Sequence, residues 1–182
     1  MTPCIAIHPA DALFHEGSFL WRLTSEKRIE GGVFSKFPDY NHLLILVEGK
    51  ALKLSFGDRK REREIQIAEG IEFSGDEPVS YDLVLGPVVE LHLIFRRDRV
   101  HPHIQNVELS KKPRSFELEG KVTFVYGMAG GVRVSIYPGE ESFLIQAGNT
   151  LHLIPSLEKK MILLDPQGVM GHVLLLEIDD RS

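Results

Sequence analysis

The stretch "LVEGKAL" (residues 46–52) joins two apolar runs through a Glu-Gly turn. A glycine turn between short apolar runs is typical of an antiparallel hairpin. The same arrangement recurs in "VYGMAGGVRV" (residues 125–134), and each hairpin is followed by a short apolar segment beside another glycine, in residues 67–75 and 145–155. The sequence therefore predicts a weak internal repeat of two antiparallel units.

Short segments rich in Val, Ile, Leu and Phe continue outward from these hairpins, separated by Gly, Pro, Asn and Asp. Their spacing of about ten residues predicts an all-β sandwich or barrel, and no long stretch has the apolar period of a helix. We expect strands at residues 19–23, 42–47, 51–56, 64–67, 80–85, 90–95, 122–126, 132–136, 142–145, 151–154, 161–164 and 172–178.

The two halves are separated by a polar stretch, "RRDRVHPHIQNVELSKKPR" (residues 96–114), which carries two prolines and lacks a clean period. We interpret residues 99–114 as a connector between an N-terminal unit, 1–98, and a C-terminal unit, 115–182, within one compact fold. The His-x-His in this stretch, His101-Pro102-His103, is expected to lie in a solvated loop rather than in a metal site.

Composition argues against several classes of partner. The chain has 182 residues and a net charge of −5, and no face is rich in Lys and Arg, so binding to nucleic acid is not expected. Its single cysteine, Cys4, fits a reducing compartment, and no apolar run approaches the length of a membrane helix. We expect a cytoplasmic protein with no membrane anchor.

The turn in residues 46–52 and the segment "AGNTLHLIP" (residues 147–155) resemble the cupin fold. Two such units imply a bicupin, built from two antiparallel β-barrel or jelly-roll units. Catalytic cupins hold a divalent metal with a His-x-His, a Glu and a further His, because the ion needs three or four converging ligands. That set is missing here. The second residue after His42 is Leu44 rather than a histidine, and His152 lies between two leucines.

A sharper resemblance covers residues 19–97. In order, this stretch contains "FLWR" (19–22), "GVFSKFP" (32–38), "LVEG" (46–49), "EFSGDEP" (72–78) and "GPVVELHLIFRR" (86–97). These motifs and their spacing resemble the HutD/Ves family. The resemblance implies a homodimeric bicupin with no established enzymatic activity and no cofactor, associated with the control of histidine degradation and proposed to bind N-formylglutamate in its barrel.

Carried onto this sequence, the resemblance implies a ligand site made of Trp21, Arg22, Ser35, Phe37, His42, Asp76, Glu90 and His92. Three of these depart from the family pattern. His42 stands where the family usually has Arg, and Glu90 and His92 stand where it has Asp and Asn. Arg grips a carboxylate with a permanent forked charge, whereas His offers one directed donor, so binding of N-formylglutamate is in question.

Strand alternation places Glu90 and His92 on the same side of their strand, and His42 is predicted to face the barrel as well. Three functions follow. The first is a non-catalytic protein that binds a small anionic metabolite as a sensor or modulator. The second is a metal-dependent cupin enzyme that uses His42, Glu90 and His92 as ligands. The third is a structural or protein-interaction module.

Overall fold

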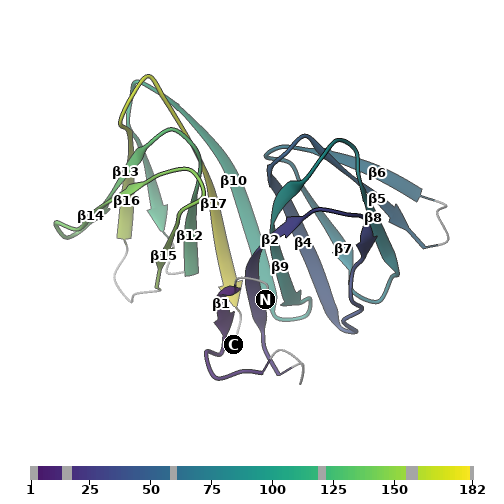
Figure 1. Ribbon diagram of the computed structural model, residues 1–182. Helices are drawn as coiled ribbons and strands as arrows, with labels where there is room; N and C mark the ends of the chain where they lie inside the picture. Colours follow the sequence, from purple (N-terminus) through teal and green to yellow (C-terminus); the bar gives the residue numbers. More distant parts are fainter. Residues whose placement is uncertain (1–3, 14–17, 58–60, 119–121, 155–159, 181–182) are drawn as a thin grey trace. The chain divides into compact units, whose positions relative to one another are not determined.

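The computed structural model describes residues 4–13, 18–57, 61–118, 122–154 and 160–180, and the regular elements in these ranges are all β-strands (Figure 1). No helix that could cross a membrane occurs in these ranges. The chain divides into two compact units, Met1–Val100 and His101–Ser182.

The first unit contains two antiparallel sheets. Their strand orders are β1-β2-β9-β4-β7 and β3-β8-β5-β6. The strands are β1 (Cys4–His8), β2 (Trp21–Arg28), β3 (Gly32–Val33), β4 (Tyr40–Glu48), β5 (Ala51–Phe56), β6 (Arg61–Gln66), β7 (Gly70–Ser74), β8 (Val79–Leu83) and β9 (Val88–Arg96).

The core of the first unit is formed by alternate side chains of facing strands, since period-2 alternation puts them on one face. Leu44 and Leu46 of β4 pack in one cluster with Leu52 and Leu54 of β5. Both faces of β4 are buried between Leu43 and Val47, which explains why this strand reads as a continuous apolar run.

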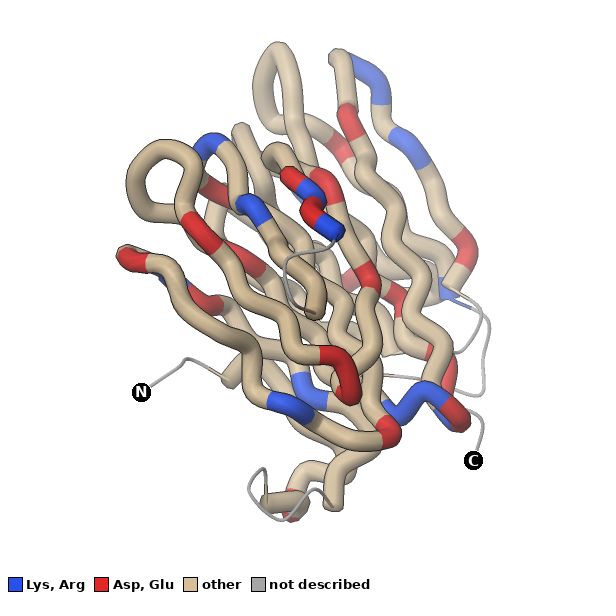
Figure 2. Tube along the Cα trace, turned by 90° about the vertical axis from the view of Figure 1, so that its right-hand side faces the viewer, with Lys and Arg blue, Asp and Glu red and all other residues tan. Residues whose placement is uncertain are grey.

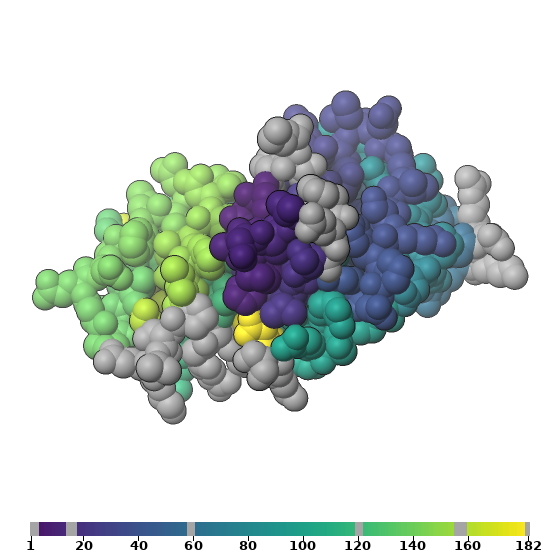
Figure 3. All heavy atoms as spheres, turned by 90° about the horizontal axis from the view of Figure 1, so that it is seen from below, coloured from purple at the N-terminus to yellow at the C-terminus, as the bar shows by residue number. Residues whose placement is uncertain are grey.

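Edge strands of this unit are short or charged. β6, at one edge, alternates positive and negative side chains from Arg61 to Glu64 (Figure 2). β1, at another edge, is partly exposed, and its atoms are among the darkest purple ones in Figure 3. Charge and short length on edge strands disfavour pairing with other chains.

The second unit repeats the arrangement, with sheets of order β10-β17-β12-β15 and β11-β16-β13-β14. Its core includes Val125, Val134, Leu164 and Val173. The strands are β10 (Val100–Ser110), β11 (Arg114–Leu118), β12 (Val122–Ala129), β13 (Val132–Tyr137), β14 (Ser142–Ile145), β15 (Thr150–Leu153), β16 (Lys160–Pro166) and β17 (Met170–Asp180).

The all-β prediction is confirmed, and each of the twelve expected strands overlaps a strand of the structure. The prediction of a connector at residues 99–114 is wrong, because most of these residues belong to β10. Its second half alternates buried Val107 and Leu109 with exposed Asn106 and Glu108, a period that the prolines and histidines nearby obscured. His101 and His103 are exposed on this strand rather than in a loop. Pro102 is tolerated because β10 is an edge strand.

The turn of "LVEGKAL" requires its glycine. Gly49 has φ +100°, and a Cβ atom there would lie 2.8 Å from the backbone oxygen of Pro87. We expect Gly49→Ala to lower the free energy of unfolding by about 2–4 kcal/mol, through backbone strain together with the clash. Gly86 also has positive φ but has nothing within 4 Å of an added Cβ. Urea denaturation of Gly86→Ala should therefore show the smaller loss, and equal losses would contradict the role of the clash.

Candidate functional site

The first unit contains a partly open cavity of about 230 Å³. β2, β4, β9 and the segment around β3 form its walls. The side chains that line it are Arg22, Glu26 and Arg28 from β2, Val33, Phe34, Ser35 and Phe37 from the segment at 33–37, His42 from β4, and His92 and Ile94 from β9.

Strand register explains why these residues meet. On β2, Arg22, Glu26 and Arg28 are separated by even numbers of residues and so share one face. Between β4 and β9, His42 is paired with Ile94 and Leu44 with His92. The two histidines are therefore diagonal neighbours on the same face of the sheet.

A hydrogen-bonded histidine pair lines the cavity. The Nδ1 of His42 lies 2.8 Å from the Nε2 of His92, so one nitrogen donates and the other accepts. Burial lowers the pKa of His42 to about 4, and burial together with the charges of His42, Arg28 and Arg22 lowers the pKa of His92 well below its ordinary value. Both imidazoles are therefore neutral at pH 7. Phe73 stacks on His42, with ring centroids 4.9 Å apart.

The second nitrogen of His42 has no partner among the described protein atoms. His42 is only 1% exposed, and its Nε2 is buried without a hydrogen bond. An unsatisfied buried polar atom is costly, so such atoms in native proteins usually meet water or a ligand. When the Nε2 of His92 is the donor of the pair, the Nε2 of His42 carries a proton and offers it to an acceptor.

An ion-pair network lies beside the histidines. The Nε and Nη2 of Arg28 donate to the Oε1 of Glu90 at 3.0 and 2.7 Å, and Nη2 also lies 2.6 Å from the Oε2 of Glu26. The Nη1 of Arg28 donates to the hydroxyl of Tyr81 at 3.2 Å. Burial raises the pKa of Glu90 to about 7 even though Arg28 opposes this shift, and the Oε2 of Glu90 is buried without a hydrogen bond.

The structure gathers most of the residues predicted for the site. Arg22, Ser35, Phe37, His42 and His92 line the cavity, and the prediction that His42 faces the barrel is confirmed. Glu90 is fully buried and is not among the lining residues. It accepts hydrogen bonds from Arg28, which does line the cavity.

Two predicted residues lie elsewhere. Trp21 points to the opposite face of β2 from Arg22, because the two are consecutive on a strand, and it stacks on His8 at a centroid distance of 5.8 Å. Asp76 lies in the exposed turn after β7, where Arg97 and Ser74 donate hydrogen bonds to it. Neither residue lines the cavity.

The alternative metal site is not formed by the side chains that were expected to make it. The described part of the chain contains no group of three His, Cys, Asp or Glu residues placed to hold a metal ion. His42 and His92 are hydrogen-bonded directly to each other, and Glu90 is bound by Arg28. The two histidines therefore bind each other and Glu90 binds Arg28, instead of the three converging on one point.

Sequence reasoning missed Glu26, Arg28 and Phe34. The expected strand ended at residue 23, whereas β2 continues to Arg28. Extending the alternation from Arg22 along "RLTSEKR" would have placed Glu26 and Arg28 on the same face. Phe34 was not among the predicted site residues, but the centroid of its ring lies 5.4 Å from that of His92 and 5.5 Å from the guanidinium carbon of Arg28.

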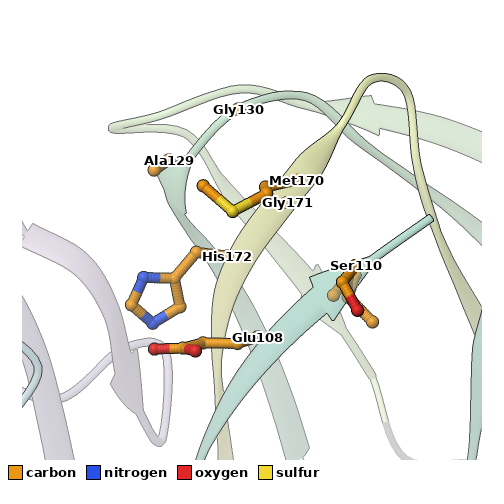
Figure 4. Close-up of a pocket in the computed structure, with 8 residues that line it drawn as sticks. Glu108, Ser110, Ala129, Gly130, Met170, Gly171 and His172 are labelled. Atoms are coloured by element: carbon orange, nitrogen blue, oxygen red, sulfur yellow. The ribbon is translucent and has the colours of Figure 1, made fainter. Parts of the chain in front are cut away.

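A second cavity, of about 610 Å³, lies in the second unit. Figure 4 shows the side chains of Glu108, from β10, and His172, from β17, pointing into the same space. His172 is hydrogen-bonded to Asn106. Among its described lining residues there is a carboxylate but no Lys or Arg, so this cavity is less suited than the first to an anion.

Comparison with protein families gives one family model, HutD, that matches residues 1–168. A Pseudomonas putida protein described as an uncharacterized 21.2 kDa protein in the hutC 3' region is 29% identical over 87 residues. That match covers 48% of this chain and 45% of the relative, so it spans less than half of the relative's length.

Solved structures share the fold over most of the chain. A conserved protein of unknown function from Pseudomonas aeruginosa PAO1 superposes with a TM-score of 0.86 and 22% identity, over 99% of this chain and 91% of that one. HutD from Pseudomonas fluorescens SBW25 gives a TM-score of 0.74 and 23% identity, over 94% and 85%. A cupin 2 conserved barrel domain protein from Leptotrichia buccalis gives 0.55 and 9%, over 88% and 83%. The fold is that of the cupins.

Proposed function

Because the chain belongs to the HutD family, we propose that it is a non-catalytic protein that binds a small anionic metabolite in the cavity of its first unit. The observation that carries this proposal is the buried Nε2 of His42, which lies without a protein hydrogen-bond partner at a cavity also lined by Arg22 and Arg28. Two guanidinium groups and a directed N–H donor together match the oxygens of a carboxylate.

A role in histidine catabolism is the biological part of this proposal. The P. putida relative is described as lying in the hutC 3' region, and the family carries the HutD name. We propose that the metabolite is an anion of that catabolism, such as N-formylglutamate, and that binding serves a sensor or modulator role. His42 and His92 bind each other and Arg28 binds Glu90, and among the described lining residues no hydrogen bond pairs a nucleophile with a base, which supports binding rather than catalysis.

A thermal-unfolding titration tests the proposal. N-formylglutamate, glutamate, urocanate and histidine would each be added to the wild type and to His42→Arg. A ligand at a hundred times its dissociation constant adds about 2.7 kcal/mol, which raises the unfolding midpoint by a few degrees. We expect at least one of the anions to stabilise the wild type.

The His42→Arg variant tests whether anion binding requires a permanent positive charge at position 42. Stabilisation of this variant alone would show that the cavity binds anions only with a permanent charge at position 42. Stabilisation of neither protein by any of the four compounds would contradict the proposed function. Glu72→Gln serves as the control, since Glu72 is exposed on β7 and accepts a hydrogen bond from Asn41 away from the cavity.

A further inference from the structure

The direction of the hydrogen bond between His42 and His92 decides what this pair offers to a ligand. Building on the proposed function, we infer that His92 is a positioning residue for His42. The Nε2–H group of His92 donates to the Nδ1 of His42, so that the Nε2 of His42 is an N–H donor that binds a carboxylate oxygen of the ligand.

Proton counting links the two ends of the histidine pair. A neutral imidazole carries one N–H group and one bare nitrogen. The Nδ1 of His42 and the Nε2 of His92 lie 2.8 Å apart, so one proton lies between them. The two outer nitrogens, the Nε2 of His42 and the Nδ1 of His92, therefore have opposite roles. When one of them is an N–H donor, the other is bare.

Both rings are neutral at pH 7, so the positions of their protons decide their contact with an anion. His42 is 1% exposed and His92 is 5% exposed, and burial lowers the pKa of each. For His92, the nearby charges of His42, Arg28 and Arg22 lower the pKa further. An anion therefore meets an N–H group or a bare nitrogen here, and not a positively charged ring.

The outer nitrogen of His42 is the one that gains most from a ligand oxygen. It is buried and has no hydrogen-bond partner among the described protein atoms. A buried N–H group without an acceptor is costly, and a carboxylate oxygen placed there removes that cost. An ionised carboxylate only accepts hydrogen bonds, so a bare Nε2 would repel it. Carboxylate binding at His42 therefore requires His92 to be the donor of the pair.

Neighbouring rings hold both imidazoles in the orientation that this hydrogen bond needs. Phe73 stacks on His42 with an interplanar angle of 10°, and Phe34 meets His92 edge-on, at 75°. A half-turn of the His42 ring would put a carbon atom in the place of Nδ1 and break the bond to His92. Packing thus holds the rings, and a ligand selects only where the protons lie.

His92 acts through His42 rather than as a second donor to the ligand. It lines the same cavity. In the arrangement that binds a carboxylate, however, its outer nitrogen is bare and does not attract an anion.

Nitrogen-15 NMR of the full chain, labelled at histidine, reads the proton positions at pH 7, because protonated and bare ring nitrogens give different signals. Spectra would be recorded without ligand and with N-formylglutamate, glutamate, urocanate or acetate. Signals lost in His42→Arg and in His92→Gln assign the two rings. With the anion that binds most tightly, we expect both rings to carry their proton on Nε2 and neither to be an imidazolium.

Two variants of His92 test its role by affinity. Gln offers an amide N–H group to the Nδ1 of His42, whereas Met has the same unbranched length and no N–H group. Isothermal titration with the same anion should give a dissociation constant within about threefold of wild type for His92→Gln and about tenfold weaker for His92→Met. Glu72→Gln should leave the constant unchanged. If His92→Met does not fold, the spectra of the wild type still decide.

The results separate this inference from the proposed function. If an anion binds while His42 carries its proton on Nδ1, or while either ring is an imidazolium, the role of His92 is overturned and anion binding stands. The same follows if His92→Met binds as tightly as His92→Gln, or if a bound anion leaves the signals of both rings unchanged. If none of the four anions binds, the proposed function fails and this inference fails with it.

Discussion

Replacement of Arg28 by methionine is expected to lower the free energy of unfolding by up to about 1.4 kcal/mol more at pH 8 than at pH 5, because the buried carboxylate of Glu90 needs its counter-ion only above its pKa of about 7. Glu90 is 0% exposed, and the Nε and Nη2 of Arg28 supply its hydrogen bonds. Methionine keeps an unbranched apolar stem, so the main change is loss of the guanidinium group. Urea denaturation of the variant and the wild type measures the difference.

The loss should shrink at low pH. Without Arg28, the pKa of Glu90 would rise further. Burial would still raise this pKa, and the positive charge that now lowers it would be gone. At pH 5 the carboxyl group is then neutral and its burial costs little. Arg97→Met is the matched control: Arg97 pairs with Asp76 on an exposed turn, and such surface pairs contribute about 0–1 kcal/mol. A loss in Arg28→Met that is the same at pH 8 and at pH 5 would contradict the electrostatic role of Arg28.

The amount of structure that could be predicted from the sequence differs between fold and site. Strands such as β4 and β5 were predictable because a continuous apolar run or a clear alternation reports burial directly. β10 was missed because a Pro and two histidines precede its alternating apolar residues in the sequence. β3 was missed because it has only two residues, too few to show a period.

The site was predictable only where single-strand alternation decided it. His42 was predicted to face the barrel and lines the cavity, whereas alternation placed Glu90 and His92 on one side of β9 without deciding which side faced inward, because β9 is buried on both faces. The hydrogen bond between His42 and His92 depends on the register between β4 and β9, which pairs residues about fifty positions apart and leaves no trace in either segment. The same reason hides the Arg28–Glu90 pair, which joins β2 to β9.

Between about pH 4.5 and 6.5, the titration of Glu90 should offset part of the rise in wild-type stability that the buried histidines cause, and Glu90→Gln should remove this offset. The pKa of Glu90 is raised from 4.5 to about 7, so the native state binds more protons than the unfolded state across that window. The free energy of unfolding contributed by Glu90 therefore falls by about 3 kcal/mol as the pH rises from 4.5 to 7.

His42 acts in the opposite direction. Its pKa is lowered from 6.5 to about 4, so the unfolded state binds more protons, and stability rises with pH by up to about 3 kcal/mol over that range. His92, whose pKa is also lowered, adds to the rise. In the wild type, the fall from Glu90 therefore offsets only part of the rise from the two histidines.

Glu90→Gln keeps an oxygen that accepts from Arg28 but removes the titration. Relative to the wild type, the variant should therefore gain about 3 kcal/mol of stability between pH 4.5 and 7.5, with most of the gain below pH 7. Urea denaturation at intervals of one pH unit measures both curves, and Glu72→Gln controls for the loss of an exposed carboxylate. Parallel curves for Glu90→Gln and the wild type would show that the pKa of Glu90 is the same in the folded and unfolded states. That result would contradict the raised pKa expected for a buried carboxyl group.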